Sequence, residues 1–183
     1  KQCIFNLCLA ILDQGDEVII PAPYWVSYTD IAQLTGAKPV VVYCGIDQEF
    51  KMLPSQLEEA ISENTKLVLI NSPSNPTGAV HSREEVEAIG KWAYENGLWV
   101  ITDEIYQNLT YDGLKAYSIT EVFPELTDRT IMVNGVAKTY AMTGWRLGWM
   151  AGPLDAMKAA ANLQSHLSSN VSNISQRAAL AAL

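Results

Sequence analysis

Short apolar runs alternate with amphipathic segments along the whole chain. Each run is continuous and does not alternate with polar residues, and the runs lie at residues 17–21, 38–44, 66–72, 98–102 and 130–134. A continuous apolar run of this length, between turn residues, is typical of a strand covered on both faces. We therefore predict five buried strands, and a sixth strand at residues 145–152.

The segments between the runs carry apolar residues at helical spacing. Residues 2–12 form one apolar helical face, which Gly15 is placed to end. Ser82 and Glu85 form a capping box for a helix over residues 83–97. Further helices are predicted at residues 53–64, in a short segment before Gly36, and from Pro153 to the end of the chain. Such alternation predicts an α/β fold, a mostly parallel open sheet flanked by helices on both faces.

Composition narrows the possible partners. The chain has 183 residues, about one domain by length, and shows no internal repeat or linker. Its net charge of −8 argues against a basic nucleic-acid groove and against an anionic membrane surface. No apolar run reaches the roughly 18 residues that span a bilayer. Its charged fraction of 17% is below the roughly 25% of an average domain, which suggests surface that another domain or subunit covers.

Cysteine and histidine patterns predict no metal site. The three cysteines have neither CxxC nor His-paired spacing, and the two histidines are isolated; these residues are Cys3, Cys8, Cys44, His81 and His166. Free thiols are typical of a reducing compartment, so we expect a cytoplasmic protein.

Polar side chains follow the predicted strands, where an open α/β sheet binds its ligands. Tyr24 and Trp25 come after the first strand, and Asn75 after the third. Asp103 and Tyr106 follow the fourth, while Lys138 and Arg146 follow the fifth. Taken singly, each has a simpler explanation: SNPTG is a good turn, Asp103 can cap a short helix, and a loop lysine is usually solvated. Their joint order and spacing indicate a site.

Four stretches carry a resemblance to a known family: PAPYWVSY, NSPSNPTGAV, ITDEIY and NGVAKTYAMTGWRLGW. In this order they resemble the class I aminotransferases, which have the fold-type-I pyridoxal-phosphate fold, and the bacterial aspartate aminotransferase branch most closely. The resemblance runs over essentially all 183 residues. KTYAMTGWRLG is its most specific string, whereas NPTG alone is weak.

The resemblance implies a role for each polar residue. Lys138 resembles the lysine that forms a Schiff base with pyridoxal 5′-phosphate, and Asp103 the carboxylate paired with the pyridine nitrogen. Tyr106 and Asn75 resemble the two donors to the phenolic oxygen. Trp25 resembles the ring stacked on the pyridine, with Tyr24 as its alternative. Phosphate contacts are implied for Arg146 and for the helix start at Lys1, whose side chain in this branch reaches a substrate carboxylate. The candidate substrate contacts are thus Trp25, Asn75 and Lys1. The candidate catalytic residues are Lys138, Asp103 and Tyr106.

These residue types suit that chemistry on their own terms. A Schiff base needs a primary amine, and a buried carboxylate favours a protonated pyridine nitrogen, which makes the ring an electron sink. Once the substrate amine has displaced the lysine from its Schiff base, the lysine amine is free to move the substrate's α-proton as general base and acid. The planar fork of arginine matches phosphate, and a helix N-terminus adds a positive dipole end.

The chain departs from the family pattern in two ways. Ala137 and Gly135 stand where many members have serine, which puts a hydroxyl contact in doubt. We also expect residues 1–183 to be an incomplete cofactor-binding large domain, because the glycine-rich turn, the N-terminal arm and the C-terminal small domain of the family have no counterpart here. The α-carboxylate arginine of the small domain would be missing, so we expect the isolated piece to be poorly active.

Three functions remain open on the sequence. The first is amino transfer from an acidic amino acid, such as aspartate, to 2-oxoglutarate by a ping-pong Schiff-base route, in a homodimer as is typical of the family. The second is another reaction on the same platform, a carbon–sulfur lyase or an aromatic or prephenate-type aminotransferase. The third is a non-catalytic regulator domain built on this fold.

Overall fold

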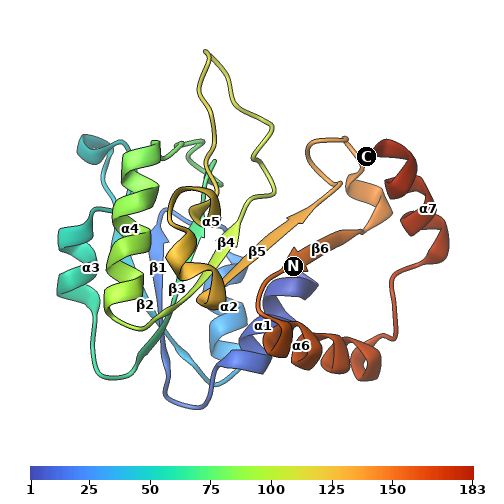
Figure 1. The fold of residues 1–183 in the computed structure, drawn as a ribbon, viewed down its shortest axis with the longest axis horizontal. Coiled ribbons are helices and arrows are strands. Elements are labelled where there is room, and N and C mark those ends of the chain that lie inside the picture. The colour runs from blue at the N-terminus through green and yellow to red at the C-terminus, as the bar shows by residue number, and fades with distance from the viewer.

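One six-stranded sheet organises the molecule, in a computed structural model that describes residues 1–183. The strands run in the order β2-β1-β3-β4-β5-β6 (Figure 1). Their bounds are β1 Glu17–Ala22, β2 Lys38–Tyr43, β3 Thr65–Asn71, β4 Trp99–Asp103, β5 Thr130–Gly135 and β6 Gly148–Ala151. The pairs from β2 to β5 are parallel, and β6 is antiparallel to β5. The predicted mostly parallel α/β fold is confirmed.

Helices cover both faces of this sheet (Figure 1). One face carries α1 Gln2–Ile11, α2 Ser27–Leu34 and α6 Leu154–Leu167; the other carries α3 Pro54–Ala60, α4 Arg83–Glu95 and α5 Ile119–Val122. Short 3₁₀ turns lie at Ile46–Gln48, Pro124–Arg129 and Thr143–Trp145, and α7 Asn173–Ala182 lies beyond β6. No helix combines the length and the apolar character needed to cross a membrane.

The continuous apolar runs are explained by two separate cores. Along β1, Val18 and Ile20 pack in the core beneath α1, α2 and α6, whereas Ile19 packs in the core beneath α3, α4 and α5. All three side chains are at most 1% exposed. Because successive side chains of a strand point to opposite faces, a strand buried on both sides must be apolar at every position.

Most predicted elements are confirmed, with local corrections. The capping box is present, since Ser82 Oγ accepts a hydrogen bond from Glu85 N and Glu85 Oε2 accepts one from Ser82 N. The helix predicted over residues 53–64 ends at Ala60, because Ile61 adopts an extended backbone. The strand predicted at 145–152 is confined to β6, and Arg146 lies before it in a left-handed backbone conformation, with φ 52°.

Two glycines hold together the base of the loop between β5 and β6. Gly135 pairs with Gly148 across the two strands. A Cβ on Gly135 would lie 2.9 Å from the carbonyl oxygen of Leu147, and one on Gly148 would lie 2.8 Å from the carbonyl oxygen of Asn134. Neither position has room for a side chain unless the facing backbone shifts. The loop of residues 136–147 is thereby fixed at both ends.

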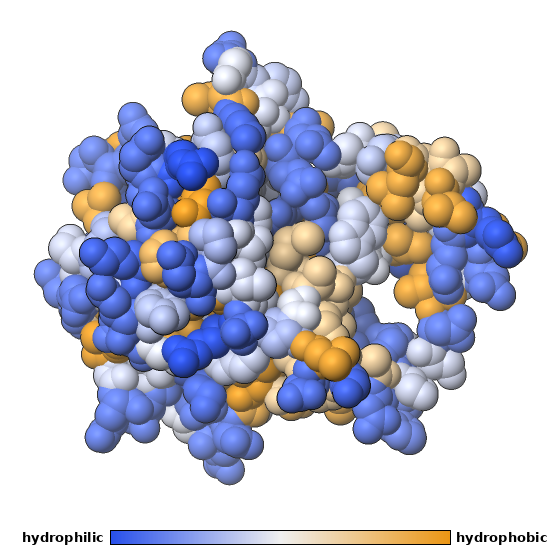
Figure 2. Space-filling model, in the orientation of Figure 1, coloured by the Kyte–Doolittle hydropathy of each residue, from blue (hydrophilic) through white to orange (hydrophobic).

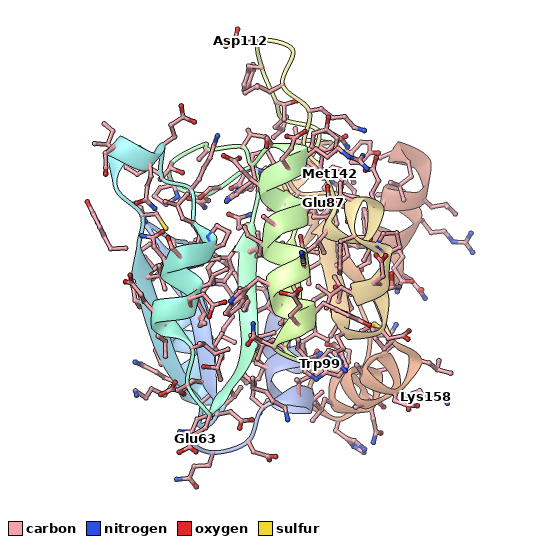
Figure 3. The ribbon with its side chains drawn as sticks, turned by 60° about the vertical axis from the view of Figure 1, so that its left-hand side comes forward. Glu63, Glu87, Trp99, Asp112, Met142 and Lys158 are labelled. Atoms are coloured by element: carbon pink, nitrogen blue, oxygen red, sulfur yellow. The ribbon has the colours of Figure 1, made fainter.

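Loops that follow the parallel strands gather at one end of the molecule. Glu63, just before β3, lies at the opposite end from Met142 in the loop after β5 (Figure 3). The long loop after β4 projects from this same end, with Asp112 at its tip. As expected of an open α/β sheet, the residues that follow β3, β4 and β5 meet at one rim.

Candidate active site

A cavity of about 1040 Å³ lies at this rim. It is bounded by the start of α1, the ends of β4 and β5, the loop before β6, and residues of α6 and α7. Figure 2 shows an opening between the body of the molecule and its C-terminal helix. Seven of the eight predicted site residues line the cavity, namely Lys1, Trp25, Asn75, Asp103, Tyr106, Lys138 and Arg146.

Asp103 is the only carboxylate that lines this cavity. It is the last residue of β4 and is 6% exposed. Its Oδ2 accepts a hydrogen bond of 2.9 Å from the hydroxyl of Tyr28, and its Oδ1 accepts one of 3.2 Å from the backbone N–H of Ile105. Burial raises the pKa of Asp103 above its ordinary value, and these two donors partly offset that effect. The segment after Asp103 is a turn and not the short helix of the simpler explanation, although Asp103 does accept the N–H of Ile105 at the start of this turn.

Asn75 and Tyr106 form a pair of polar side chains beside Asp103. The amide nitrogen of Asn75 lies 3.5 Å from the hydroxyl oxygen of Tyr106, at the limit of a hydrogen bond. The backbone N–H of Asn75 donates to the side chain of Asn71, whose own amide donates to the carbonyl oxygen of Asp103. Asn71 therefore ties the loop after β3 to the end of β4, and places two hydrogen-bond donors at one wall of the cavity.

Lys138 and Arg146 come from the loop between the two glycines. Lys138 Nζ lies 5.5 Å from the centre of the Tyr106 ring and makes no ion pair. Arg146 donates a 2.6 Å hydrogen bond from Nη1 to the carbonyl oxygen of Thr143, which holds the guanidinium near its own loop. An amine and a guanidinium eight positions apart in the chain are thus brought to the same cavity.

Lys1 and Trp25 complete the charged and aromatic lining. Lys1 precedes α1, and its Nζ lies 4.9 Å from the centre of the Trp25 ring, within cation–π range. With Lys138 and Arg146, Lys1 makes three cations facing the single carboxylate of Asp103. In a chain of net charge −8, this excess of positive charge fits a ligand that carries anionic groups.

Comparisons with known proteins identify the family. The model of the family described as aminotransferase class I and II matches residues 1–183. The chain belongs to this aminotransferase family.

Individual relatives agree with the family assignment. The chain is 57% identical to an aspartate aminotransferase of Streptomyces avermitilis, over all of this chain and 45% of that protein. It is 49% identical to a probable aspartate/prephenate aminotransferase of Rickettsia conorii, over all of this chain and 46% of that protein. The crystal structure of an aspartate aminotransferase from Rhizobium meliloti superimposes with a TM-score of 0.96 at 42% identity, over 99% of this chain and 46% of that one. The chain thus spans about half the length of the curated relatives it matches.

One predicted residue of this aminotransferase chain lies outside the cavity. Tyr24 packs against the core beneath α1 and α2 and lines a separate small void with Pro21 and Asn75. Trp25, the next residue, lines the cavity, whereas Tyr24 does not. Because sequence alone does not fix the direction of side chains in a loop, the two were interchangeable as stacking partners. The alternative of Tyr24 as a cavity residue is wrong.

The sequence interpretation missed Tyr28. It lies one turn after Trp25 on α2, is 3% exposed, lines the cavity and is the only side chain that donates a hydrogen bond to Asp103. Burial and the neighbouring Asp103 carboxylate raise the pKa of Tyr28 well above its ordinary value, so that its hydroxyl remains a donor. The available signal was the spacing of three residues from Trp25, since Trp25 lies just before α2 and the two ring centres are 5.4 Å apart, edge to face.

We expect Tyr28→Phe to destabilise the fold of this chain in a pH-dependent way. The change removes the donor to a buried carboxylate, and at neutral pH this costs about 1.5–3 kcal/mol of unfolding free energy. Because the Tyr28 hydroxyl lowers the pKa of Asp103, its contribution is present when Asp103 is ionised and is lost as the pH falls toward the ordinary aspartate value of 3.8. Denaturant unfolding of the variant at several pH values measures this effect. Tyr24→Phe is the matched control, and an equal loss in both variants, or a loss independent of pH, would contradict the assignment.

Proposed function

We propose that this chain is the cofactor-binding large domain of an aminotransferase that uses pyridoxal 5′-phosphate. Its reaction would move an amino group from an acidic amino acid, such as aspartate, to 2-oxoglutarate in a ping-pong cycle. The observation that carries this proposal is that Lys138 and Asp103, which are 35 positions apart in the printed sequence, line one cavity together with two further cations. An amine, a buried carboxylate and anion-binding groups are what this cofactor requires.

The donor set fits the cofactor group by group. The Lys138 amine would bond its aldehyde carbon, and Asp103, whose second oxygen is held by Tyr28, would keep a proton on its ring nitrogen. Arg146 and the start of α1 would bind its phosphate, with Trp25 against the ring. When bound, the cofactor supplies an electron sink that stabilises negative charge at the substrate's α-carbon.

The chain's own residues then carry out the proton transfers and the positioning. Lys138 Nζ, once displaced by the substrate amine, would hold and move the proton of the substrate's α-carbon as general base and general acid. Asn75 and Tyr106 would donate hydrogen bonds to the ring oxygen. Lys1 would bind the side-chain carboxylate of an acidic substrate. Its ammonium group would then leave its present place over the Trp25 ring.

A second candidate is amino transfer to prephenate. The name of the Rickettsia conorii relative includes both aspartate and prephenate. Prephenate carries a second carboxylate, as an acidic amino acid does, and Lys1 would bind it. A carbon–sulfur lyase would share Lys138, Asp103 and Arg146, and is distinguished by its product.

Half-reaction kinetics with different amino donors test these proposals. We expect aspartate to react faster than phenylalanine, and cystathionine to give no carbon–sulfur cleavage. Lys1→Met should raise the KM for aspartate by about 10- to 100-fold, which corresponds to the loss of one charge-assisted hydrogen bond. The KM for phenylalanine should stay nearly unchanged. Acceptor assays compare 2-oxoglutarate with prephenate. Release of a 2-oxo acid and a thiol from cystathionine, without transamination, would contradict the proposal.

We further propose that the protein acts as a homodimer in the cytoplasm. Its low charged fraction and several exposed apolar side chains near the cavity end, among them Val26, Ile174 and Leu180, support a covered surface. Sedimentation of the protein at micromolar concentration tests this, and a monomer would contradict it.

A further inference from the structure

His81 is an anomaly in an otherwise well-paired interior. It lies between β3 and α4 and is 5% exposed. Neither ring nitrogen has a hydrogen-bond partner, and these are the only two buried side-chain nitrogen or oxygen atoms in the chain without one. A buried polar group without a partner costs free energy and calls for an explanation.

The backbone of His81 closes the loop that carries Asn75. Its N–H donates a 3.0 Å hydrogen bond to the hydroxyl oxygen of Ser72, which lies directly after β3. Between these two residues the loop is held by Gly78 N donating to Ser74 O and by Ser74 N donating to Ala79 O. The position of Asn75 at the cavity therefore depends on the closure of residues 72–81, with His81 at its end.

Two charged groups face the imidazole, and both are already paired. Glu85, on the first turn of α4, accepts a 2.6 Å hydrogen bond from Ser82 N and lies 3.4 Å from Lys51 Nζ. Lys51, from the segment before α3, also pairs with Glu49 at 2.8 Å. Neither ring nitrogen has an acceptor in the closed loop, so a protonated imidazole would have to compete for Glu85 with these two partners. Burial lowers the pKa of His81 to about 4, and Lys51 adds to this while Glu85 opposes it.

We propose that His81 is a positioning residue for Asn75 and that uptake of a proton by His81 releases the loop of residues 72–81. When neutral, the imidazole stays buried without a hydrogen-bond partner and the loop stays closed. When protonated, it must either draw Glu85 away from the capping box of α4 or move into solvent, and both open the loop. The consequence for catalysis rests on the proposed function, in which Asn75 contacts the cofactor. The release of the loop does not depend on that function.

The direction and size of the effect follow from linkage. The open loop binds a proton with the ordinary histidine pKa of 6.5, and the closed loop only with a pKa of about 4. Stability of the closed loop is therefore fully present above pH 6.5 and is lost as the pH falls toward 4. Between about pH 7.5 and pH 5 the opening equilibrium should rise by about 30-fold.

Hydrogen exchange on the protein without cofactor tests the proposal. Protection factors, corrected for the intrinsic pH dependence of exchange, should fall by about 30-fold for amides of residues 72–82 over that pH range, while those of β4 hold. His81→Phe should remove the pH dependence, and the matched change His166→Phe, at the only other histidine, should keep it. An equal fall in wild type and His81→Phe, or no fall in wild type, would overturn the proposal.

A second measurement needs no variant at position 81. The chain has two histidines, so their ring signals in a nuclear magnetic resonance titration are resolved with one assignment variant, His166→Phe. We expect His81 to titrate below 6.5, between the open-loop value and the closed-loop value of about 4, with the backbone amide of Asn75 shifting over the same range. Titration of His81 near 6.5, or an Asn75 amide that does not respond, would overturn the proposal. A protein that shows the release but binds no cofactor would refute the proposed function and leave this inference standing.

Discussion

Under the proposed function, transamination is expected to fall by on the order of 10⁴-fold or more when Lys138 is replaced by alanine. This one change would remove both the proposed bond to the cofactor and the proposed carrier of the α-proton. Lys138 is exposed in the cavity and has no ion-pair partner, so its loss should leave the fold intact. Borohydride reduction of the protein with cofactor, followed by peptide mass spectrometry, locates the bond. The wild-type protein should carry the cofactor mass on the peptide that contains Lys138, and the variant should carry none.

Lys1→Ala is the matched control for this experiment, because Lys1 is the other lysine that lines the cavity. It should retain the label at Lys138 while binding acidic substrates more weakly. A label that remains in Lys138→Ala, or that disappears in Lys1→Ala, would show that the amine was assigned wrongly.

Asp103→Asn is expected to lower turnover by about 10²- to 10³-fold, in the range seen when one well-placed electrostatic group is removed from an active site. The amide can still accept a hydrogen bond from Tyr28, so the position is preserved while the negative charge is lost. Without that charge, a proton on the ring nitrogen is no longer favoured, and the electron sink is weakened. Single-turnover rates with aspartate measure this effect apart from substrate binding.

Glu104→Gln provides the control for the loss of a buried carboxylate. Glu104 is the next residue, is 5% exposed and accepts hydrogen bonds from Ser118 and Thr102, but it does not line the cavity. Its variant should turn over within a few-fold of wild type. Similar rates for Asp103→Asn and wild type, or similar losses in both variants, would remove the electrostatic argument.

The sheet was predictable because its physical cause is visible in the sequence. Residues 67–70 of β3 are apolar without a break because side chains on both faces of the strand are buried. Ser82 with Glu85 marks the start of α4 by a local pattern. The gathering of Asn75, Asp103 and Lys138 at one rim followed from parallel strand order.

What the sequence could not show depends on tertiary contacts. Tyr28 sits on a short helix with no long-range signal, and only the fold brings its hydroxyl to Asp103. The direction of β6 and the place of Arg146 depend on the close approach of Gly135 and Gly148, which no periodicity reveals. The choice of Trp25 over Tyr24 depends on how the loop after β1 turns.

A crystal structure of the protein grown with pyridoxal 5′-phosphate is the most direct test of the central claim. The account predicts continuous density from Lys138 Nζ to the cofactor, with the ring nitrogen about 3 Å from an oxygen of Asp103. A cofactor bound elsewhere, or bound in this cavity with Asp103 turned away from its ring, would contradict the claim.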